Sequence, residues 1–417
     1  MARILLCFAL AILALDAKVQ ARDLTLPEAQ ALLVRNNREL QAARRGMESA
    51  DAQRVIAGAR PNATLSVNAS SINDSNTIDN QKRGADTVLR IDQPFERGNK
   101  RGLRLDAADG LQRAARHDYL DTLRQQMAVL QGAYFDLKLA QEKARTLAEN
   151  AQLFSGTLGA AQRRLQAGDL APADVAKVQV DYERAQNDAR AAQAELARAQ
   201  LTLAYLLAFE AEALELRAAD AWPALERADA KAIEQAIDAR PDVAAARARV
   251  EAAEKLRDLA RAQRTRDVTV GAQYERWVPG GPPTSSFGLG ISMPLFTGYD
   301  FAGDIQKAEV DRYAALDALA KTRAQAANEL RRAAGDLNAA AERVERFDGS
   351  LLAAASRSAE ASEFAFSRGA ISVLEVLDAR RTLRAVRLEA LGARADYAKA
   401  LGAWRAAQAS VQALEGK

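Results

Sequence analysis

Residues Val175 to Leu206, with the sequence VAKVQVDYERAQNDARAAQAELARAQLTLAYL, place an apolar residue at alternating spacings of three and four. These positions are Val175, Val178, Tyr182, Ala185, Ala189, Ala192, Leu196, Ala199, Leu203 and Leu206. The same spacing recurs about 200 residues later, at Val376, Ala379, Leu383, Val386, Ala390, Ala393, Tyr397, Ala400, Trp404 and Ala407. Such a repeat is typical of a coiled-coil seam, because about 3.5 residues per turn keep one stripe facing a partner helix.

Each seam follows a short break, and a long helical pattern precedes each break. Gly168-Asp169-Leu170-Ala171-Pro172 comes before the first seam, and Arg368-Gly369-Ala370-Ile371-Ser372 comes before the second. The patterns before the breaks cover about residues 99–166 and 300–367, which is on the order of 100 Å of helix each. The sequence therefore predicts two long helical hairpins with tips near Gly168 and Gly369.

Two further helices are expected, one at the start of each half. Thr25-Leu26-Pro27-Glu28 forms a capping box, with Thr25 as the N-cap and Glu28 reaching back to it. This helix is predicted to run to about Ala59. Its counterpart covers about residues 232–264, with Pro241 near its start or at a break.

Apolar and polar residues alternate in two other segments, residues 62–93 and 267–293. Leu65 and Val67, for example, flank Ser66, and each segment has a turn-rich loop in its middle. The alternating runs are about ten residues long, the length that a tilted membrane strand needs. The sequence therefore predicts one β-hairpin in each half.

The first 21 residues are predicted to be a secretory signal peptide. Arg3 is followed by the apolar run Ile4 to Leu15, and Val19-Gln20-Ala21 supplies a small residue for cleavage before Arg22. The run is too short for a membrane-spanning helix, which needs about 20 apolar residues. If the protein crosses a membrane, we expect it to do so as strands.

Composition argues against an enzyme, a cofactor and a nucleic-acid partner. The net charge is +3, and basic and acidic residues are interleaved, as on solvated helix faces. His117 is the only histidine, and the only cysteine, Cys7, lies in the signal peptide. The usual ligands of a transition-metal site are therefore not available. No phosphate-binding glycine loop or nucleophile elbow occurs.

The predicted strands imply an oligomer. Four strands cannot close a membrane barrel, because about eight is the usual minimum. Open strand edges in lipid leave backbone groups unpaired, at a cost of several kcal/mol each. Other copies of the chain must therefore complete the sheet.

The duplicated layout resembles the TolC-type outer-membrane efflux proteins across essentially the whole mature chain. The matching residues are Leu24-Thr25-Leu26 with Glu28-Ala29, Asn36-Asn37, Glu39-Leu40, Gly168 with Asp174-Val175, and Gly369 with Glu375-Val376-Leu377-Asp378-Ala379. The resemblance implies a mainly α fold with membrane β-strands: a homotrimer with a 12-stranded β-barrel in the outer membrane of a Gram-negative bacterium, continued by a periplasmic α-helical barrel. It also implies a periplasmic adaptor and an inner-membrane pump as partners.

This layout divides the chain into five segments. Residues 1–21 are the signal peptide, 22–208 the first structural repeat, 209–231 a linker or equatorial segment, 232–409 the second repeat, and 410–417 a C-terminal tail.

Within the family, three short motifs resemble the CzcC-like branch, which exports heavy-metal cations. They are Gln93-Pro94-Phe95-Glu96, Lys100-Arg101 and Met293-Pro294-Leu295-Phe296. Arg97-Gly98-Asn99 departs from that branch, which more often has two glycines there. The resemblance implies a passive exit duct of a tripartite, RND-type efflux system for heavy-metal cations or other small toxic compounds. A drug- or protein-export duct of the same family stays an alternative.

Three acidic residues beside the predicted tips are candidates for the periplasmic entrance: Asp174, Glu375 and Asp378. Acidic residues in a first helical turn are also favoured by the helix dipole alone. The resemblance adds the second interpretation, in which rings of carboxylates around the trimer axis favour cations. Arg368 and Arg380 are expected to be near enough to pair with them in a closed state. The position of the family's gating arginine holds Ile371.

The tips themselves are candidates for docking the adaptor. The first tip contains Ala167, Gly168, Asp169 and Leu170, and the second contains Arg368, Gly369, Ala370 and Ile371. Their simplest role is to turn the chain, with glycine supplying left-handed backbone geometry. The resemblance favours end-to-end docking against another helical hairpin.

Two other protein classes compete with the exit duct. A periplasmic adaptor also has a long helical hairpin, but it needs neither the duplication nor two sets of membrane-length strands. A secreted structural coiled coil would lack the strand hairpins and their loops.

Overall fold

The computed structural model describes residues 22–70, 77–78, 81–82, 85–229, 232–278, 282–368 and 370–415. The predicted signal peptide, Gly369 and the last two residues lie outside this part. The chain forms two compact units. The first contains the described residues of Met1–Ala43, Leu120–Arg240 and Gln325–Lys417, and the second contains those of Arg44–Tyr119 and Pro241–Ala324. Helices α4 (Lys100–Gln166) and α8 (Ala302–Arg346) contribute to both.

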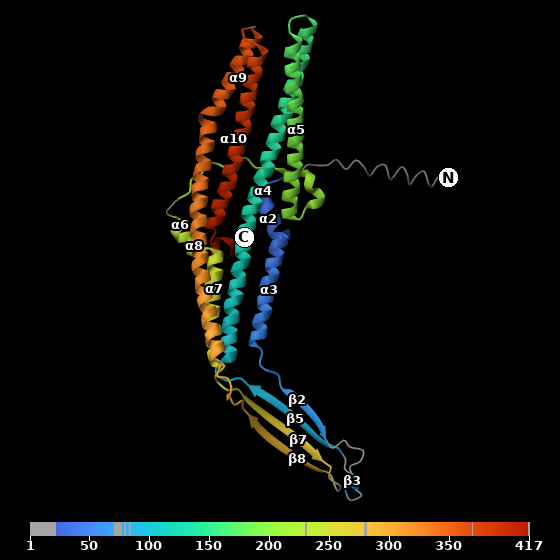
Figure 1. Ribbon diagram of the computed structural model, residues 1–417, viewed down its shortest axis with the longest axis vertical. Helices are drawn as coiled ribbons and strands as arrows, with labels where there is room; N and C mark the ends of the chain where they lie inside the picture. Colours follow the sequence, from blue (N-terminus) through green and yellow to red (C-terminus); the bar gives the residue numbers. More distant parts are fainter. Residues whose placement is uncertain are drawn as a thin grey trace, which may run out of the picture. The chain divides into compact units, whose positions relative to one another are not determined.

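The second unit holds a four-stranded antiparallel sheet in the order β2-β5-β7-β8 (Figure 1). These strands are β2 (Thr64–Ser70), β5 (Asp86–Phe95), β7 (Val268–Trp277) and β8 (Thr284–Ser292). The predicted strands are confirmed, and the loop after β2 adds the short pair β3 (Thr77–Ile78) and β4 (Gln81–Lys82). The two hairpins join through β5 and β7, where Leu89 lies opposite Tyr274. Within the described chain, β2 and β8 each have one neighbour, so both edges of the sheet are open.

One face of this sheet is apolar and the other is polar. The strand register places four side chains in one apolar row: Val67, Leu89, Tyr274 and Phe287. The adjacent row, on the opposite face, contains Ser66, Arg90, Gln273 and Gly288. The apolar side chains are strongly exposed, with Phe287 at 87%, Leu289 at 90% and Ile291 at 77%. A continuous exposed apolar face of this kind marks a membrane or protein contact.

A tight corner links β5 to α4. Gly98 and Asn99 both have left-handed backbone angles, with φ of 72° and 55°. A Cβ atom on Gly98 would lie 2.8 Å from the Cβ atom of Thr265. Lys100 is buried and its Nζ atom lies 2.8 Å from both carboxylate oxygens of Asp267. The corner therefore requires glycine for space as well as for backbone conformation.

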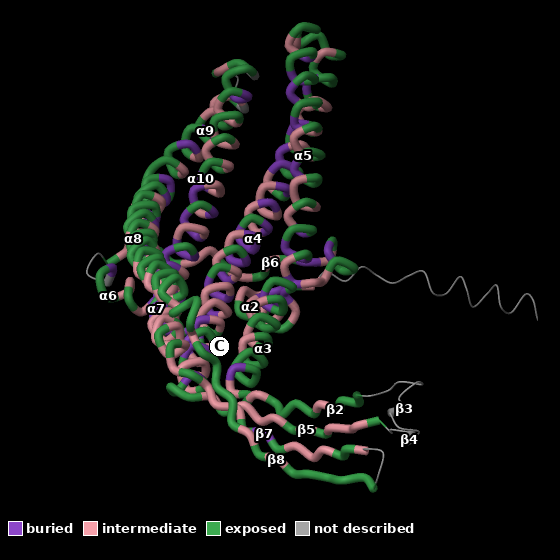
Figure 2. Tube along the Cα trace, turned by 60° about the horizontal axis from the view of Figure 1, so that its bottom comes forward, coloured by how far each residue is buried: buried purple, intermediate pink, exposed green. Residues whose placement is uncertain are grey.

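Two long helical hairpins dominate the first unit, as the seams predict (Figure 1). The first joins α4 to α5 (Pro172–Leu207), and the second joins α9 (Leu352–Ser367) to α10 (Val373–Gln408). Seam residues are buried, including Val178, Ala185 and Leu203 at 0% exposure. Buried positions recur along these helices, whereas the strands show almost none (Figure 2). None of the described helices is both long and apolar enough to cross a membrane.

The prediction of one continuous first helix is wrong, because the helix is broken at Asn37. Helix α2 (Leu26–Asn36) has the predicted capping box, and α3 (Arg38–Gly58) follows the break. The Asn37 backbone is extended, and its Oδ1 atom accepts the backbone N–H of Leu40 at 3.1 Å. Its Nδ2 atom donates to the Leu206 carbonyl at 3.0 Å. Asparagine thus caps the new helix and fastens the break to α5.

The corresponding helix of the second half is also divided. Helix α6 (Ala232–Ala239) ends before Pro241, and α7 (Pro241–Ala262) begins there. This agrees with the predicted break, because proline is tolerated at the first helical position but not in the interior. The long pattern over 300–367 also contains a π-helical turn, Phe347–Leu351, between α8 and α9.

The segment between the halves was predicted only as a linker or equatorial segment, and the structure gives it defined elements. A 3₁₀ helix (Glu210–Glu215) leads into β6 (Leu216–Ala218), which pairs in parallel with β1 (Arg22–Leu24). The tail also differs from the prediction, because α11 (Val411–Glu415) buries Leu414 to 4% exposure.

A buried ionic network lies in the first unit. Arg240 is 1% exposed and Arg124 is 5% exposed. Their guanidinium groups lie 2.7 and 3.1 Å from the two carboxylate oxygens of Glu329. Burial raises the pKa of Glu329, but the hydrogen bond from Arg240 and the charge of Arg124 outweigh this and hold the pKa below its usual value.

Candidate functional site

The first hairpin tip turns at Gly168, whose φ is 84°. The backbone N–H of Asp169 donates to the Arg164 carbonyl at 2.9 Å, and that of Gly168 donates to the Leu165 carbonyl at 3.0 Å. These bonds end α4, and Pro172 begins α5. Ala167, Gly168 and Asp169 are exposed, whereas Leu170 is half-buried.

The second tip lies between α9 and α10. Helix α9 ends at Ser367 with Arg368 as its C-cap, and the backbone N–H of Ala370 donates to the Ala365 carbonyl at 2.9 Å. The guanidinium of Arg368 lies 5.3 Å from the centre of the Phe364 ring, an attractive cation–π contact. Arg368 and Ala370 are exposed and Ile371 is half-buried. The described tip residues therefore present a small, mostly exposed surface.

Glu375 is part of the helix cap of α10. Its backbone N–H donates to Ser372 Oγ at 3.4 Å, and that hydroxyl donates to Glu375 Oε1 at 3.1 Å. Asp378 lies one turn further on, is exposed, and has no hydrogen bond or ion pair within the described chain. Both carboxylates line a hollow of about 400 Å³, together with the hydroxyl groups of Ser358, Ser362 and Thr382.

Asp174 belongs to the other hairpin and does not line this hollow. It lies in the first turn of α5 and pairs with Lys177 at 3.3 Å. The structure therefore brings two of the three predicted acidic residues together and leaves the third in a local ion pair.

The tip of α10 is anchored on the first hairpin. Leu377 is 1% exposed and packs among residues of α4 and α5. Its buried neighbours are Phe154, Ala161, Val175, Val178 and Ala185. Beside it, Arg381 Nη2 lies 2.7 and 2.5 Å from the two oxygens of Asp181, and Arg384 Nη1 lies 2.9 Å from Asp188. Apolar contact and ion pairs thus hold α10 against α5.

In this structure Arg380 pairs with neither Glu375 nor Asp378, the partners considered for a closed state. Its Nε atom donates to Glu363 on α9 at 2.8 Å, and its Nη1 atom donates to Thr157 on α4 at 3.1 Å. Arg380 sits on the side of α10 that faces these two helices, and its donors are used there. Arg368 likewise makes its described contact with Phe364 rather than with a carboxylate.

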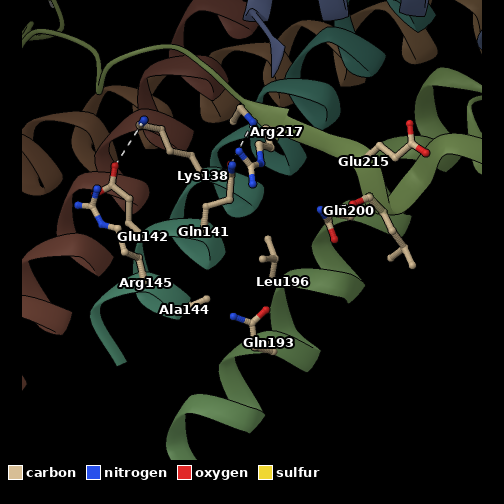
Figure 3. Close-up of a pocket in the computed structure, with 12 residues that line it drawn as sticks. Lys138, Gln141, Glu142, Ala144, Arg145, Gln193, Leu196, Gln200, Glu215 and Arg217 are labelled. Carbon is tan, nitrogen blue, oxygen red and sulfur yellow. Dashed lines mark hydrogen bonds and ion pairs between the residues drawn. The ribbon is translucent and has the colours of Figure 1, made fainter. Parts of the chain in front are cut away.

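A separate hollow of about 700 Å³ lies between α4, α5, the 3₁₀ helix and β6 (Figure 3). Two of the amide side chains that line it, Gln141 and Gln200, hold the linking segment. Gln200 Nε2 donates to the carbonyls of Leu214 and Leu216, and Gln141 Oε1 accepts the backbone N–H of Ala218. These contacts fix β6 beside the first hairpin. In the described part of the chain, no group of three or more His, Cys, Asp or Glu residues could hold a metal ion.

Two long segments of the chain match a known protein family. The sequence profile described as "Outer membrane efflux protein" matches residues 29–208 and 232–410. The chain belongs to the outer membrane efflux protein family. It is an exit duct of the outer membrane of a Gram-negative bacterium and extends into the periplasm.

Individual relatives agree with this membership. A curated relative, the cobalt-zinc-cadmium resistance protein CzcC of Cupriavidus metallidurans, is 26% identical over 374 residues, which cover 89% of this chain and 87% of that protein. Among solved structures, the outer-membrane channel OprN has a TM-score of 0.76 at 20% identity and covers 92% of this chain and 89% of its own. CusC has a TM-score of 0.75 at 18% identity, with 94% and 93% covered. The open MtrE channel of Neisseria gonorrhoeae has 0.75 at 17% identity, with 94% and 92% covered. The fold is that of these channels.

Sequence reasoning missed the residues that hold α10 against the first hairpin of this efflux protein. The missed residues are Thr157, Asp181, Asp188, Arg381 and Arg384. A signal for Asp181 was present, because it is three residues after Val178 and four before Ala185, so the helical period places this charge at the edge of the apolar seam. Asp181 is only 6% exposed, and a charge in such a position needs a partner.

Proposed function

We propose that three copies of this chain join their sheets into one closed duct, which carries cations from the periplasm to the exterior. The observation that supports this is the sheet of β2, β5, β7 and β8. It has one exposed apolar face and two open edges. Open edges are not tolerated in lipid, so the edges of neighbouring copies must pair. Three copies supply the twelve strands of the proposed barrel.

The polar face of each sheet would line the interior. Arg90, Asp92 and Gln273 belong to this face, and Gly271 and Gly288 leave space beside them. The apolar face, with Leu289 and Ile291, would meet lipid. This separation is the arrangement expected of a water-filled membrane barrel.

We place the selectivity of the entrance at Glu375 and Asp378. Both carboxylates border one hollow, and Asp378 has no cationic partner in the described chain. Three copies around one axis would give a ring of negative charge, which favours cations. Asp174 contributes less, because Lys177 offsets its charge.

Heavy-metal cations are the proposed cargo, with other small toxic compounds as the wider class. The support is the relative whose name specifies cobalt, zinc and cadmium resistance. The cations would pass along carboxylate rings rather than bind a dedicated cluster of ligands. An inner-membrane pump would supply the energy, and a periplasmic adaptor would dock on the hairpin tips at Ala167–Leu170 and Arg368–Ile371.

We also propose that residues 22–208 and 232–409 are two structural repeats of one ancestral unit, joined by 209–231 after removal of the signal peptide 1–21. The repeated order of helix, strand pair and helical hairpin supports this division.

The test is ion selectivity in a planar bilayer. We expect cation-selective current from the purified protein, and a weakened cation preference from the Glu375→Ala/Asp378→Ala double variant. A matched control is Glu183→Ala/Glu389→Ala, which removes two exposed carboxylates that have no ion pair in the described chain. An equal effect of both double variants would contradict the entrance assignment. A folded but monomeric, water-soluble protein without current would contradict the duct itself.

A further inference from the structure

Four exposed arginines surround the end of the sheet from which the long helices start. They are Arg60, Arg97, Arg101 and Arg266, and we refer to them as the arginine band. None of them has an ion pair with a carboxylate in the described residues. Arg101 Nε donates to the Gly58 carbonyl at 2.6 Å, and the Arg266 guanidinium lies 5.6 Å from the centre of the Phe296 ring.

The arginine band comes from three separate segments that meet at this end of the second unit. Gln93 Nε2 donates to the Pro61 carbonyl at 3.0 Å, which places Arg60 beside the end of β5. The backbone N–H of Arg97 donates to Asp267 at 2.9 Å, which places it beside the start of β7 and Arg266. These bonds bring the three segments that carry the four arginines to the same end of the sheet.

Nearby carboxylates do not neutralise the arginine band, because they are already paired with other cations. Asp267 pairs with Lys100 at 2.8 Å, and Asp300 pairs with Arg264 at 3.2 Å. Glu96 pairs with Arg104, and the hydrogen bond from Arg104 lowers the pKa of Glu96, so this carboxylate stays ionised. The band therefore keeps its positive charge.

The arginine band is continuous with the apolar face of the sheet. Phe95 ends β5 on that face and is 54% exposed. Met293 and Leu295, just after β8, are 45% and 74% exposed. Arginine next to such a face can lay its aliphatic stem along apolar surface and place its guanidinium in the headgroup layer. The guanidinium then matches a phosphate group with two hydrogen bonds.

We propose that the arginine band binds the headgroups of anionic phospholipids in the periplasmic leaflet of the outer membrane. The proposal rests on the proposed membrane duct, since only a membrane-spanning sheet brings this end to a headgroup layer. In the trimer, three arginine bands would form a collar of twelve guanidinium groups. The attraction between the collar and anionic headgroups fixes the depth of the duct in the bilayer. It acts together with the match between the apolar strands and the thickness of the hydrocarbon core.

The test uses the full-length protein with Phe95→Trp, reconstituted in phosphatidylcholine vesicles. In this protein and in all its variants the native Trp222, Trp277 and Trp404 are replaced by Phe, so that quenching by trace brominated phosphatidylglycerol or brominated phosphatidylcholine reports the lipid beside residue 95. We expect phosphatidylglycerol to associate about fivefold or more strongly than phosphatidylcholine at low salt, since each arginine near an anionic surface contributes on the order of 1 kcal/mol. The preference should fall in about 0.5 M salt, because exposed charges are then screened.

The decisive variant adds four substitutions to the Phe95→Trp protein: Arg60→Gln, Arg97→Gln, Arg101→Gln and Arg266→Gln. Its association with phosphatidylglycerol should be about as strong as with phosphatidylcholine. A matched control changes four exposed arginines elsewhere, Arg190, Arg198, Arg332 and Arg357, to Gln and should keep the preference. Retained preference in the first variant, or equal loss in both, would overturn the proposal. Competition by inorganic phosphate at constant ionic strength would also overturn it, because the band would then be a site for the free ion.

Conductance separates this proposal from the proposed function. The arginine-band variant should conduct like the parent in a bilayer of phosphatidylcholine alone. A parent that conducts but shows no lipid preference would overturn the lipid site and leave the duct intact.

Discussion

Arg381 on α10 reaches both carboxylate oxygens of Asp181 on α5, at 2.7 and 2.5 Å. Asp181 is 6% exposed, whereas about half of the Arg381 side chain is exposed. Removal of Arg381 therefore leaves a nearly buried carboxylate without its cation. This pair ties the second hairpin to the first just inside the tips.

We predict that Arg381→Gln loosens the tip of α10 and raises the conductance of the duct. Leaving a buried charge unpaired costs about 3–5 kcal/mol at fully buried sites, and the exposed arginine places this pair below that range. Single-channel recording in a planar bilayer is the measurement. Arg387→Gln is the control, because Arg387 is exposed on the same helix and has no ion pair in the described chain. If Asp181→Asn fails to reduce the effect of Arg381→Gln in the double variant, the pair is not its cause.

Leu377 gives a prediction about packing at the same contact. Its side chain is 1% exposed among Phe154, Val175 and Val178. Leu377→Ala should cost about 2–5 kcal/mol, because it removes buried methyl groups and leaves a cavity. Hydrogen exchange of the backbone amides in α10 would measure the loss where it occurs. Leu374→Ala is the control, since Leu374 is 39% exposed; similar exchange in the two variants would contradict the anchoring role.

The helical frame could be predicted from sequence because it depends on a period that many residues share. One atypical residue changes such a pattern little. The 3-4 spacing that includes Val178 therefore predicted the helical hairpins, and the alternation around Leu65 predicted the strands. Breaks depend on single side chains. Asn37 ends one helix because its side-chain amide donates a hydrogen bond to the carbonyl of Leu206, 169 residues away. No local sequence pattern indicates that bond.

In the candidate site, too, contacts within one helix follow from the sequence, whereas contacts between helices do not. Glu375 and Asp378 share one turn of one helix, so their spacing of three residues is enough to bring them together. The partners of Arg380 and Arg381 come from α4, α5 and α9, and only the packing of these helices selects them. The pairing of β1 with β6 likewise joins Arg22 to Leu216, and both strands are too short for their alternation to be recognised.

The lowered pKa of Glu329 predicts how the stability of the fold depends on pH. Its pKa in the folded protein is lowered, so the unfolded chain takes up a proton at higher pH than the folded one does. Stability from this group is fully present above the unfolded value of about 4.5 and is lost as pH falls through the lower folded value. Thermal unfolding should therefore shift to lower temperature below about pH 4.5. Glu329→Gln should remove part of this dependence, whereas Glu183→Gln, on an exposed face, should keep it; equal pH profiles for both would contradict the role of Glu329.

Gly98 and Gly46 should respond in opposite directions to the same substitution. Gly98 has a φ of 72°, and a Cβ atom there would lie 2.8 Å from Thr265. Gly98→Ala should therefore destabilise the corner by about 1–3 kcal/mol, from backbone strain and the clash. Gly46 lies inside α3, where a Cβ atom would meet nothing within 4 Å. Gly46→Ala should stabilise the protein by roughly 0.5–1 kcal/mol, because alanine loses less backbone freedom in a helix. Thermal unfolding of the two variants in detergent gives both signs. A Gly98→Ala variant as stable as the parent would contradict the requirement for glycine at the corner between β5 and α4, because the corner could then adopt another backbone conformation.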